Sequence, residues 1–132
     1  MKVAIVGSRH FSDPERVIEY VNSLPPGASI ITGSASGVDA AATKAARAKG
    51  IAVQVIPASF DELADPKKSG ARNQRLIDAC EVLVAFWDGT SKGTRNTVER
   101  ALDSGKEVHI FTSGGGGPPA TSSRGPQRTP SN

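Results

Sequence analysis

Short runs of apolar residues alternate along this chain with longer segments in which apolar side chains recur every three or four positions. The short runs predict buried β-strands, and the longer segments predict helices that cover a sheet. Because a helical segment separates each strand from the next, the pattern is typical of β-α-β units with a parallel sheet. The predicted strands lie near Val3 to Val6, Ser29 to Ile31, Val53 to Ile56, Val82 to Phe86 and Val108 to Phe111.

Cap and turn residues predict where the helices begin and end. Asp13 and Pro14 supply an N-cap and a first-turn proline for the first helix, which ends at Pro25-Pro26-Gly27. Its predicted apolar stripe consists of Val17, Ile18, Val21 and Leu24. The other helices are predicted from Gly37 to about Lys49, from Ser69 or Gly70 to Ala79, and from Thr94 to about Ser104.

Right-handed crossovers and doubly wound precedent favour the strand order 3-2-1-4-5. The winding then reverses between the first and fourth strands, so a crevice opens above their carboxyl ends. Gly7 to His10 and Trp87 to Thr94 emerge there, and the second strand brings Gly33 to Asp39 to the same edge. We therefore expect an α/β fold: a Rossmann-like, doubly wound, three-layer domain with a five-stranded, mainly parallel sheet and helices on both faces.

Length and composition fit one domain with a tail. Residues 1–112 are long enough to bury a core, whereas residues 113–132 are rich in Gly, Pro and Ser without a large apolar side chain, so we expect a disordered tail. Of the 16 lysines and arginines, Arg124 and Arg128 lie in the tail, which leaves 14 basic against 13 acidic residues and a net charge of +1. A protein that follows a phosphate backbone usually has a more basic face.

The sequence predicts a cytoplasmic protein without a membrane partner. No apolar run has membrane-spanning length, and the chain begins with a strand-like segment rather than a signal peptide. Cys80 is the single cysteine, which suits a reducing interior. We interpret it as a buried thiol rather than a catalytic nucleophile.

The stretch from Ser29 to Asp39 has the pattern of an anion cradle, in which a strand leads through a glycine-serine turn into a helix. Gly33 and Gly37 let the backbone turn, and the first helical N–H groups lie unpaired at the positive end of the helix dipole, where a phosphate could bind. Asp39 leaves a second interpretation open, because its carboxylate could occupy the same donors. The segment would then be only a well-capped turn.

Other donors are predicted at the same crevice. Arg9 offers a guanidinium for phosphate or base, Gly93-Thr94 opens a second helix, and Trp87 could stack on a base. Arg72 and Asn73 face away from their helix's apolar stripe and could reach across the crevice or a subunit boundary. Plainer explanations stay open: a solvated arginine, helix capping by Thr94, and core packing of the indole.

Several catalytic and cofactor motifs are absent from the sequence. Gly7 to Phe11 lacks the spaced glycines of a dinucleotide fingerprint, and Lys92-Gly93-Thr94 has the wrong order for a P-loop. Ala35 stands where a serine hydrolase has its nucleophile. No metal-ligand spacing joins the two histidines to the cysteine, so we expect no metal and no cofactor.

Six segments follow one another at characteristic spacings: Gly7-Ser8-Arg9, Thr32 to Asp39, Pro57 to Phe60, Gly70 to Asn73, Ala85 to Trp87 and Ser91 to Thr94. Together they resemble the small YspA-like (DUF2493) branch of the SLOG superfamily, over about residues 1–112. That superfamily also contains the DNA-processing protein family that binds single-stranded DNA, the cytokinin-activating phosphoribohydrolases, and sensors of nucleotide-derived signals. The resemblance implies a Rossmann-like domain that binds a nucleotide or nucleotide derivative at these segments.

One departure from the superfamily concerns enzymatic activity. The phosphoribohydrolase branch carries Pro-Gly-Gly-x-Gly-Thr-x-x-Glu, but Thr97 occupies the position of its catalytic glutamate here. Glu99 lies about 200° further round an ideal helix and should point away from a ligand. We discount that hydrolase activity, and whether the chain is an enzyme stays open, with Asp39 as a weak candidate acid or base.

The leading hypothesis is binding of a nucleotide or nucleotide-derived ligand, for sensing or sequestration, with phosphates at the two helix starts. The alternatives are a nucleotide-processing, phosphoribohydrolase-like enzyme and a single-stranded DNA-binding module. A homodimer is also expected, with Arg72, Asn73 and the Pro57 to Lys68 loop at the contact. The predicted ligand-binding residues are Gly7, Ser8, Arg9, Gly33, Ser34, Ala35, Ser36, Gly37, Asp39, Arg72, Asn73, Trp87, Gly93 and Thr94.

Overall fold

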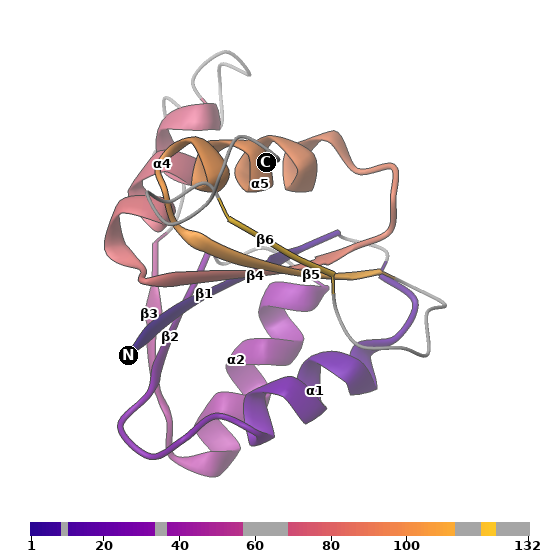
Figure 1. The fold of residues 1–132 in the computed structure, drawn as a ribbon. Helices are drawn as coiled ribbons and strands as arrows, with labels where there is room; N and C mark the ends of the chain where they lie inside the picture. The colour runs from indigo at the N-terminus through magenta and orange to yellow at the C-terminus, as the bar shows by residue number, and fades with distance from the viewer. Residues whose placement is uncertain (9–10, 34–36, 57–68, 113–119, 124–132) are drawn as a thin grey trace.

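The computed structural model describes residues 1–8, 11–33, 37–56, 69–112 and 120–123, and strands alternate with helices along most of that length (Figure 1). The strands are β1 (Lys2–Gly7), β2 (Ser29–Thr32), β3 (Ala52–Val55), β4 (Val82–Trp87), β5 (Glu107–Thr112) and β6 (Ala120–Ser123). The helices are α1 (Pro14–Asn22), α2 (Val38–Lys49), α4 (Ser69–Ala79) and α5 (Lys92–Asp103). The predicted β-α-β alternation is confirmed through β5.

The strands form one sheet in the order β3-β2-β1-β4-β5-β6. The pairs from β3 to β5 are all parallel, and Val3 of β1 lies between Ile30 of β2 and Val82 of β4. The predicted order 3-2-1-4-5 is therefore confirmed. β1 has β2 on one side and β4 on the other, so the winding reverses at β1 as expected.

β6 is a sixth strand that the sequence pattern did not predict. It pairs antiparallel with β5, from Glu107 opposite Ser123 to Ile110 opposite Ala120. The strand falls within residues 113–132, which we expected to be a disordered tail because they lack large apolar side chains. Its sequence, Ala-Thr-Ser-Ser, has no amphipathic pattern, so backbone pairing with the edge of β5 accounts for the strand. Residues 113–119 and 124–132 lie outside the described part.

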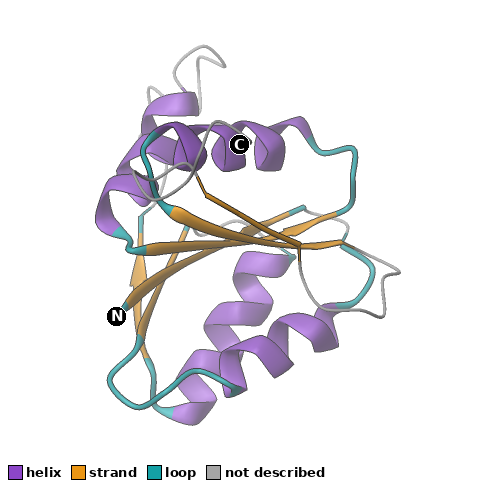
Figure 2. Cartoon of the chain, in the orientation of Figure 1, coloured by secondary structure: helices purple, strands orange, loops and turns teal. Residues whose placement is uncertain are grey.

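Helices cover both faces of the sheet and produce three layers, with α1 and α2 below and α4 and α5 above in Figure 2. Alternate strand residues point to opposite faces, which creates two cores. Ile5, Ile30 and Phe86 are buried on the α1 and α2 side, whereas Ile31 and Leu83 are buried on the α4 and α5 side. Each such side chain contributes about 1.5–3 kcal/mol on burial, so the two cores hold the layers together.

α1 differs from its prediction at two positions. Val17 and Val21 are fully buried, but Ile18 is 39% exposed, because the helix turns the Val17 and Val21 side inward and carries Ile18 toward solvent. Asp13 stands at the N-cap position, yet its side chain makes no capping hydrogen bond. Pro14 contributes no N–H at the first helical position, so one donor fewer needs a cap there.

The parallel strands give the sheet two distinct ends. We call the end where β1, β2 and β4 finish, at Gly7, Thr32 and Trp87, the carboxyl edge, and the opposite end the amino edge. The N-terminus lies at the left of Figure 2, whereas the connection from β4 to α5 lies at the right. The predicted ligand-binding residues follow strand ends, so the fold gathers the described ones at the carboxyl edge.

Candidate functional site

Gly33, Asp39 and Arg72 form a polar cluster at the carboxyl edge, which we call the Gly33 cluster. The backbone N–H of Gly33 donates to Oδ2 of Asp39 at 2.9 Å, and the Gly33 carbonyl accepts from Nη1 of Arg72 at 2.7 Å. The residues come from the end of β2, the first turn of α2 and the first turn of α4. One peptide unit therefore ties two helices to the sheet, through charge-assisted hydrogen bonds of about 1.5–3 kcal/mol each.

The approach of Arg72 explains why residue 33 is a glycine. An added Cβ would lie 2.0 Å from Nη1 and 2.8 Å from Cζ of Arg72, and 3.2 Å from Oδ2 of Asp39. The guanidinium and the carboxylate thus lie against the same α carbon. Nε of Arg72 donates to Oδ1 of Asn73 at 3.2 Å, and Asn73 is itself buried.

The first turn of α2 has no side-chain cap among the described residues. Its N-cap residue, Gly37, has φ 70° and ψ −121°, a conformation that favours glycine. Oδ2 of the Asp39 carboxylate accepts the Gly33 N–H. The start of α2 also lies at the positive end of the helix dipole, a position that generally favours an anion.

Gly7 and Ser8 join β1 to the segments on both sides of it. A Cβ at Gly7 would lie 2.5 Å from Cγ2 of Val38 and 2.7 Å from the Phe86 carbonyl oxygen. Ser8 is 1% exposed, and its hydroxyl accepts the N–H of Asp88 at 3.0 Å. Both residues therefore have structural roles in bringing α2 and the end of β4 together.

Asp88 organises the connection between β4 and α5. Its Oδ1 accepts from the N–H groups of Thr90 and Ser91 at 2.8 Å each, and from the Thr90 hydroxyl at 3.1 Å. These bonds, led by the one from the Thr90 N–H, favour the charged carboxylate and hold the pKa of Asp88 below its ordinary value of 3.8. Trp87 is attached to the same connection, because its Nε1–H donates to the Ser91 carbonyl at 3.0 Å.

α5 begins two residues earlier than predicted, at Lys92, and Ser91 is its N-cap. The Ser91 hydroxyl accepts from the N–H of Thr94 at 3.4 Å, so Thr94 is part of the first turn rather than the cap. Gly93 has no heavy atom within 4 Å of an added Cβ, which leaves its backbone open to approach. Thr94 itself is 4% exposed and faces inward.

Thr97 and Glu99 point in different directions, as the helix geometry predicted. Thr97 is 4% exposed, and its hydroxyl donates to the Gly93 carbonyl at 3.0 Å. Glu99 is exposed and lies 3.7 Å from Nε of Arg95. The position of the phosphoribohydrolase glutamate is thus filled by a hydroxyl that bonds within α5.

The first turn of α5 is positively charged. It contains no acidic residue, and the side chains of Lys92 and Arg95 are exposed there. Cations at a helix N-terminus oppose the dipole, but Arg95 lies 3.7 Å from Glu99 in an i,i+4 ion pair that supports the helix. Lys92 adds to the positive potential of the helix start and favours the approach of an anion.

Most of the predicted site residues form one row along the carboxyl edge. Close contacts lead from Asp88 through Ser8 and Gly7 to the start of α2, and from Asp39 through Gly33 to Arg72. Trp87, Gly93 and Thr94 lie at the Asp88 end of the row. Four predicted residues lie outside the described part, namely Arg9, Ser34, Ala35 and Ser36, as does the predicted loop from Pro57 to Lys68.

Three polar residues of this edge, Asp88, Ser91 and Thr32, were absent from the predicted ligand-binding residues. The Asp88-x-Thr90-Ser91 pattern is that of an Asx turn, so the roles of Asp88 and Ser91 were open to prediction. Thr32 is fully buried at the end of β2, and its hydroxyl has no hydrogen-bond partner in the described part. It alternates with Ile31 and so lies on the α2 side of the sheet, where buried hydroxyls are normally paired. The sequence placed Thr32 in one of the six family segments but gave it no role of its own.

The described residues outside this edge offer little further chemistry. Among them, no group of three or more His, Cys, Asp or Glu side chains is arranged to hold a metal ion. Burial raises the pKa of the Cys80 thiol, which is 2% exposed and donates to the Ile77 carbonyl at 3.3 Å. His109 lies on β5 with Nε2 2.5 Å from Oε2 of Glu107.

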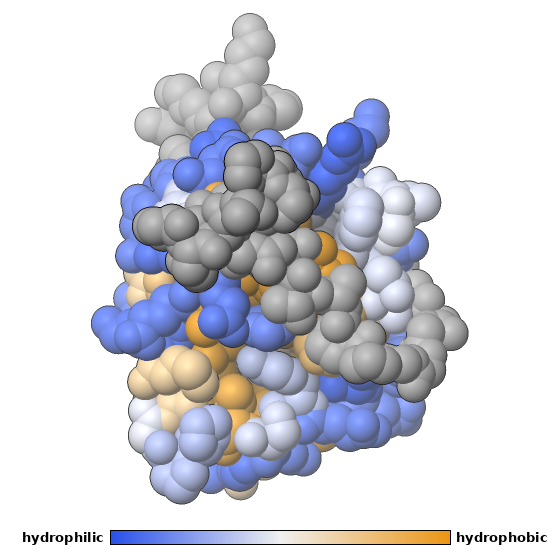
Figure 3. Space-filling model, in the orientation of Figure 1, coloured by the Kyte–Doolittle hydropathy of each residue, from blue (hydrophilic) through white to orange (hydrophobic). Residues whose placement is uncertain are grey.

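The visible surface is mainly polar. Figure 3 shows a largely hydrophilic face, with hydrophobic surface confined to smaller areas between polar side chains. Within the described part of the chain, none of the helices combines the length and apolarity that crossing a membrane requires.

Comparisons with known proteins identify the family and support the fold. Residues 1–101 match the family model described as DNA recombination-mediator protein A. The fold is similar to the X-ray structure of DNA processing protein A (DprA) from Streptococcus pneumoniae, with a TM-score of 0.68 and 23% identity. That similarity covers 83% of this chain and 49% of the other, so the chain spans about half of its length. No curated protein matches the chain. Because the matched family model covers well over half of the 132 residues, the chain belongs to the DNA recombination-mediator protein A family.

Proposed function

We propose that this chain binds single-stranded DNA at the carboxyl edge of its sheet. The observation that carries the proposal is the family match over residues 1–101, because that segment contains every predicted ligand-binding residue from Gly7 to Thr94. A strand of DNA presents a chain of phosphodiesters and a series of planar bases. The carboxyl edge offers groups suited to each.

Two helix starts support binding of the phosphodiesters. The start of α2 has no side-chain cap in the described part, and the start of α5 exposes Lys92, Arg95 and the Gly93 backbone. Backbone N–H groups and the helix dipole favour anions at both places. Neighbouring phosphates of one strand could therefore bind at neighbouring helix starts.

Trp87 supports recognition of an unpaired base. It is half-buried at the end of β4, and the hydrogen bond from its Nε1–H to Ser91 fixes the orientation of the ring. Stacking of a base on an aromatic ring is worth about 1–3 kcal/mol. Bases inside a duplex are already stacked on one another, so this contact favours single strands.

The charge of the chain indicates a short binding footprint. Residues 1–112 carry 14 basic and 13 acidic side chains, which is too balanced for a long phosphate track. Ser123, the last described residue, pairs with Glu107 at the amino edge, at the opposite end of the sheet from the candidate site. We expect contacts to only about two or three phosphates, and hence a shallow salt dependence of about −0.7 per phosphate in log affinity against log salt.

Fluorescence anisotropy with a labelled oligothymidylate tests the proposal. Lys92→Ala should weaken binding at low salt and reduce the salt slope by about 0.7, because one phosphate contact is lost. Trp87→Ala should weaken binding by about 1–3 kcal/mol at any salt concentration, with Trp87→Phe nearer to wild type. Lys2→Ala removes an exposed charge from the amino edge and is the control. It should leave the DNA affinity and the salt slope unchanged.

Two results would overturn the proposal. One is the absence of oligothymidylate binding by the folded chain at low salt. The other is binding that disappears when the chain is ended after Ser123, since the tail rather than the carboxyl edge would then be responsible.

The alternative to DNA binding is binding of a nucleotide-derived ligand, which was the leading hypothesis from the sequence. The start of α2 has no side-chain cap in the described part and offers N–H donors to a phosphate, and a near-neutral domain suits a small ligand. A thermal-shift panel of mononucleotides, ADP-ribose and cyclic dinucleotides separates the two, because a ligand at a hundred times its Kd adds about 2.7 kcal/mol. Chromatography of each ligand after incubation would reveal turnover, with Asp39→Asn testing Asp39 as the acid or base.

A further inference from the structure

The carboxyl edge continues beyond Trp87 to the end of β5, which holds none of the predicted ligand-binding residues. Thr112, the last residue of β5, is the parallel partner of Trp87 and is exposed. Phe86 and Phe111, one position earlier on each strand, stack in the core on the α1 and α2 side. Trp87 and Thr112 therefore both lie on the α4 and α5 side, on strands about 4.8 Å apart.

Two cationic side chains are exposed next to these strand ends. Lys92 and Arg95 lie in the first turns of α5, which contacts both β4 and β5. The Trp87 indole donates to the Ser91 carbonyl at 3.0 Å, and this bond holds the ring at the start of the same helix. We call the set of Trp87, Lys92, Arg95 and Thr112 the Thr112 surface. It combines positive charge, an aromatic ring and a hydroxyl.

α1 lies on the opposite side of the same part of the sheet and has the opposite charge (Figure 1). The Arg16 guanidinium is 5.0 Å from the centre of the Phe111 ring, and Tyr20 packs edge-on against that ring. Residues 13–22 contain three acids and one arginine, a net charge of −2. Residues 91–103 contain three basic residues and two acids, a net charge of +1. At the end of β5, the α5 side is therefore the better approach for a polyanion.

Two carboxylates border the Thr112 surface, and neither blocks it. Oδ1 of Asp88 already accepts the N–H groups of Thr90 and Ser91, so this charge is compensated within its own connection. Glu99 lies 3.7 Å from Nε of Arg95 and competes with a phosphate for that guanidinium. Ion pairs between exposed side chains are weak, so a phosphate can replace Glu99.

We propose that a bound strand continues from the start of α5 over the Thr112 surface rather than over α1. The inference rests on the proposed DNA-binding function and specifies the path of the strand. A base stacks on Trp87, the Thr112 hydroxyl donates to an oxygen of the neighbouring phosphodiester, and Lys92 and Arg95 neutralise phosphates. Thr112 is thus an additional binding residue at the end of β5.

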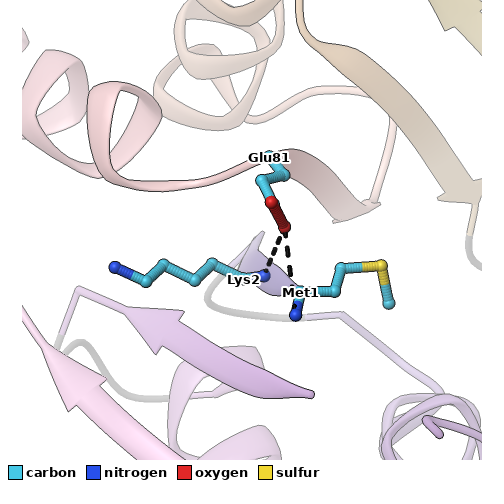
Figure 4. A network of polar contacts seen from close by, with 3 residues as sticks. All are labelled: Met1, Lys2 and Glu81. Atoms are coloured by element: carbon cyan, nitrogen blue, oxygen red, sulfur yellow. Dashed lines mark hydrogen bonds and ion pairs between the residues drawn. The ribbon is translucent and has the colours of Figure 1, made fainter. Parts of the chain in front are cut away.

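Three glutamate-to-glutamine substitutions test the path, because each raises the net charge equally at a different place. Glu99→Gln frees Arg95 for a phosphate, so it should tighten binding of a labelled oligothymidylate about threefold at low salt and steepen the salt slope by up to about 0.7. Glu15→Gln makes the change on the α1 side, and Glu81→Gln at the amino edge, where Oε2 of Glu81 accepts the Lys2 backbone N–H at 2.9 Å (Figure 4). Both controls should stay within about 1.5-fold of wild-type affinity, with an unchanged slope.

Thr112→Val tests the additional contact, because it removes the hydroxyl while keeping the branched shape. The variant should bind about threefold more weakly at every salt concentration, since a hydrogen bond and no charge is lost. Thr112→Ser keeps the hydroxyl and should bind as wild type does. Wild-type affinity in Thr112→Val would overturn the role of Thr112.

NMR titration of the wild-type chain with oligothymidylate tests the path without any substitution. The amide signals of Lys92 and Thr112 should shift, whereas those of Glu15 and Ile18 should not. Shifts on α1 without shifts on α5 would overturn the path, as would equal tightening by Glu99→Gln and Glu15→Gln. The proposed DNA binding would stand in either case, because the strand still binds. If the wild-type chain binds no strand, the proposed function itself fails.

Discussion

At the scale of single residues, close neighbours explain why two positions of the carboxyl edge, Gly7 and Gly33, are glycines. The space beside Gly7 is filled by Val38 and the Phe86 carbonyl, and that beside Gly33 by Arg72. Gly93, by contrast, has open space beside it. Glycine thus allows a close approach of neighbouring groups at Gly7 and Gly33, whereas at Gly93 it leaves the backbone accessible.

Gly7→Ala tests the close approach of α2 and β4 to β1. The added methyl group would lie 2.7 Å from a backbone oxygen that cannot move without disturbing β4. We expect a loss of about 1–3 kcal/mol in the free energy of unfolding, measured by urea denaturation. Gly93→Ala is the matched control and should be neutral or stabilising by up to about 1 kcal/mol, because alanine is the better helix former. Equal effects of the two substitutions would contradict this account.

At the scale of elements, the sequence predicted most of the strands and helices, but it misplaced the start of α5 and did not predict β6. Five strands and their order were predictable, because strands buried in a parallel sheet are continuous apolar runs, although the edge strand β3 (Ala-Val-Gln-Val) is mostly exposed. The start of α5 was predicted two residues late, since Gly93 resembled a turn residue while Ser91 was the cap. β6 was not predictable at all, because Ala-Thr-Ser-Ser carries no apolar period and is held by backbone pairing.

The connection from β4 to α5 makes the stability of the folded chain depend on pH. Hydrogen bonds from the Thr90 and Ser91 N–H groups lower the pKa of Asp88 in the folded chain. Its stabilising effect is therefore fully present above the ordinary pKa of 3.8 and is lost as the pH falls through the lowered folded-state pKa. Asp88→Asn should be less stable than wild type at pH 7, and urea denaturation should show the difference shrinking below about pH 3.8. A difference that is constant with pH would refute this role.

At the scale of the whole molecule, the parallel sheet separates the binding edge from the chain segments at the amino edge. Gly33 and Arg72 are 39 positions apart and meet because α4 packs on the sheet near the end of β2. The sequence left open whether Asp39 or a phosphate would occupy the first helical N–H groups of α2, and it did not predict the bond from the Gly33 N–H to Asp39. The unpaired Thr32 hydroxyl depends on the surrounding packing, which no local pattern encodes. The predicted homodimer stays a prediction.

Removal of residues 113–132 tests how β6 contributes to the sheet. β6 is a short edge strand of small residues that pairs only with β5, so we expect the truncated chain to stay folded with little change in the urea midpoint. Hydrogen exchange should quicken at β5 amides that bond β6, whereas amides between β4 and β5 stay protected. Global loss of protection would mean that β6 is required for the fold.

Trp87 is the single tryptophan of the chain, and it stands at the carboxyl edge with its indole N–H bonded to Ser91. Its intrinsic emission therefore comes from one place in the molecule, free of background from other indoles. An occupant of that edge should change the intensity or colour of this emission, without any attached dye. The chain carries its own optical reporter for titrating whatever binds there.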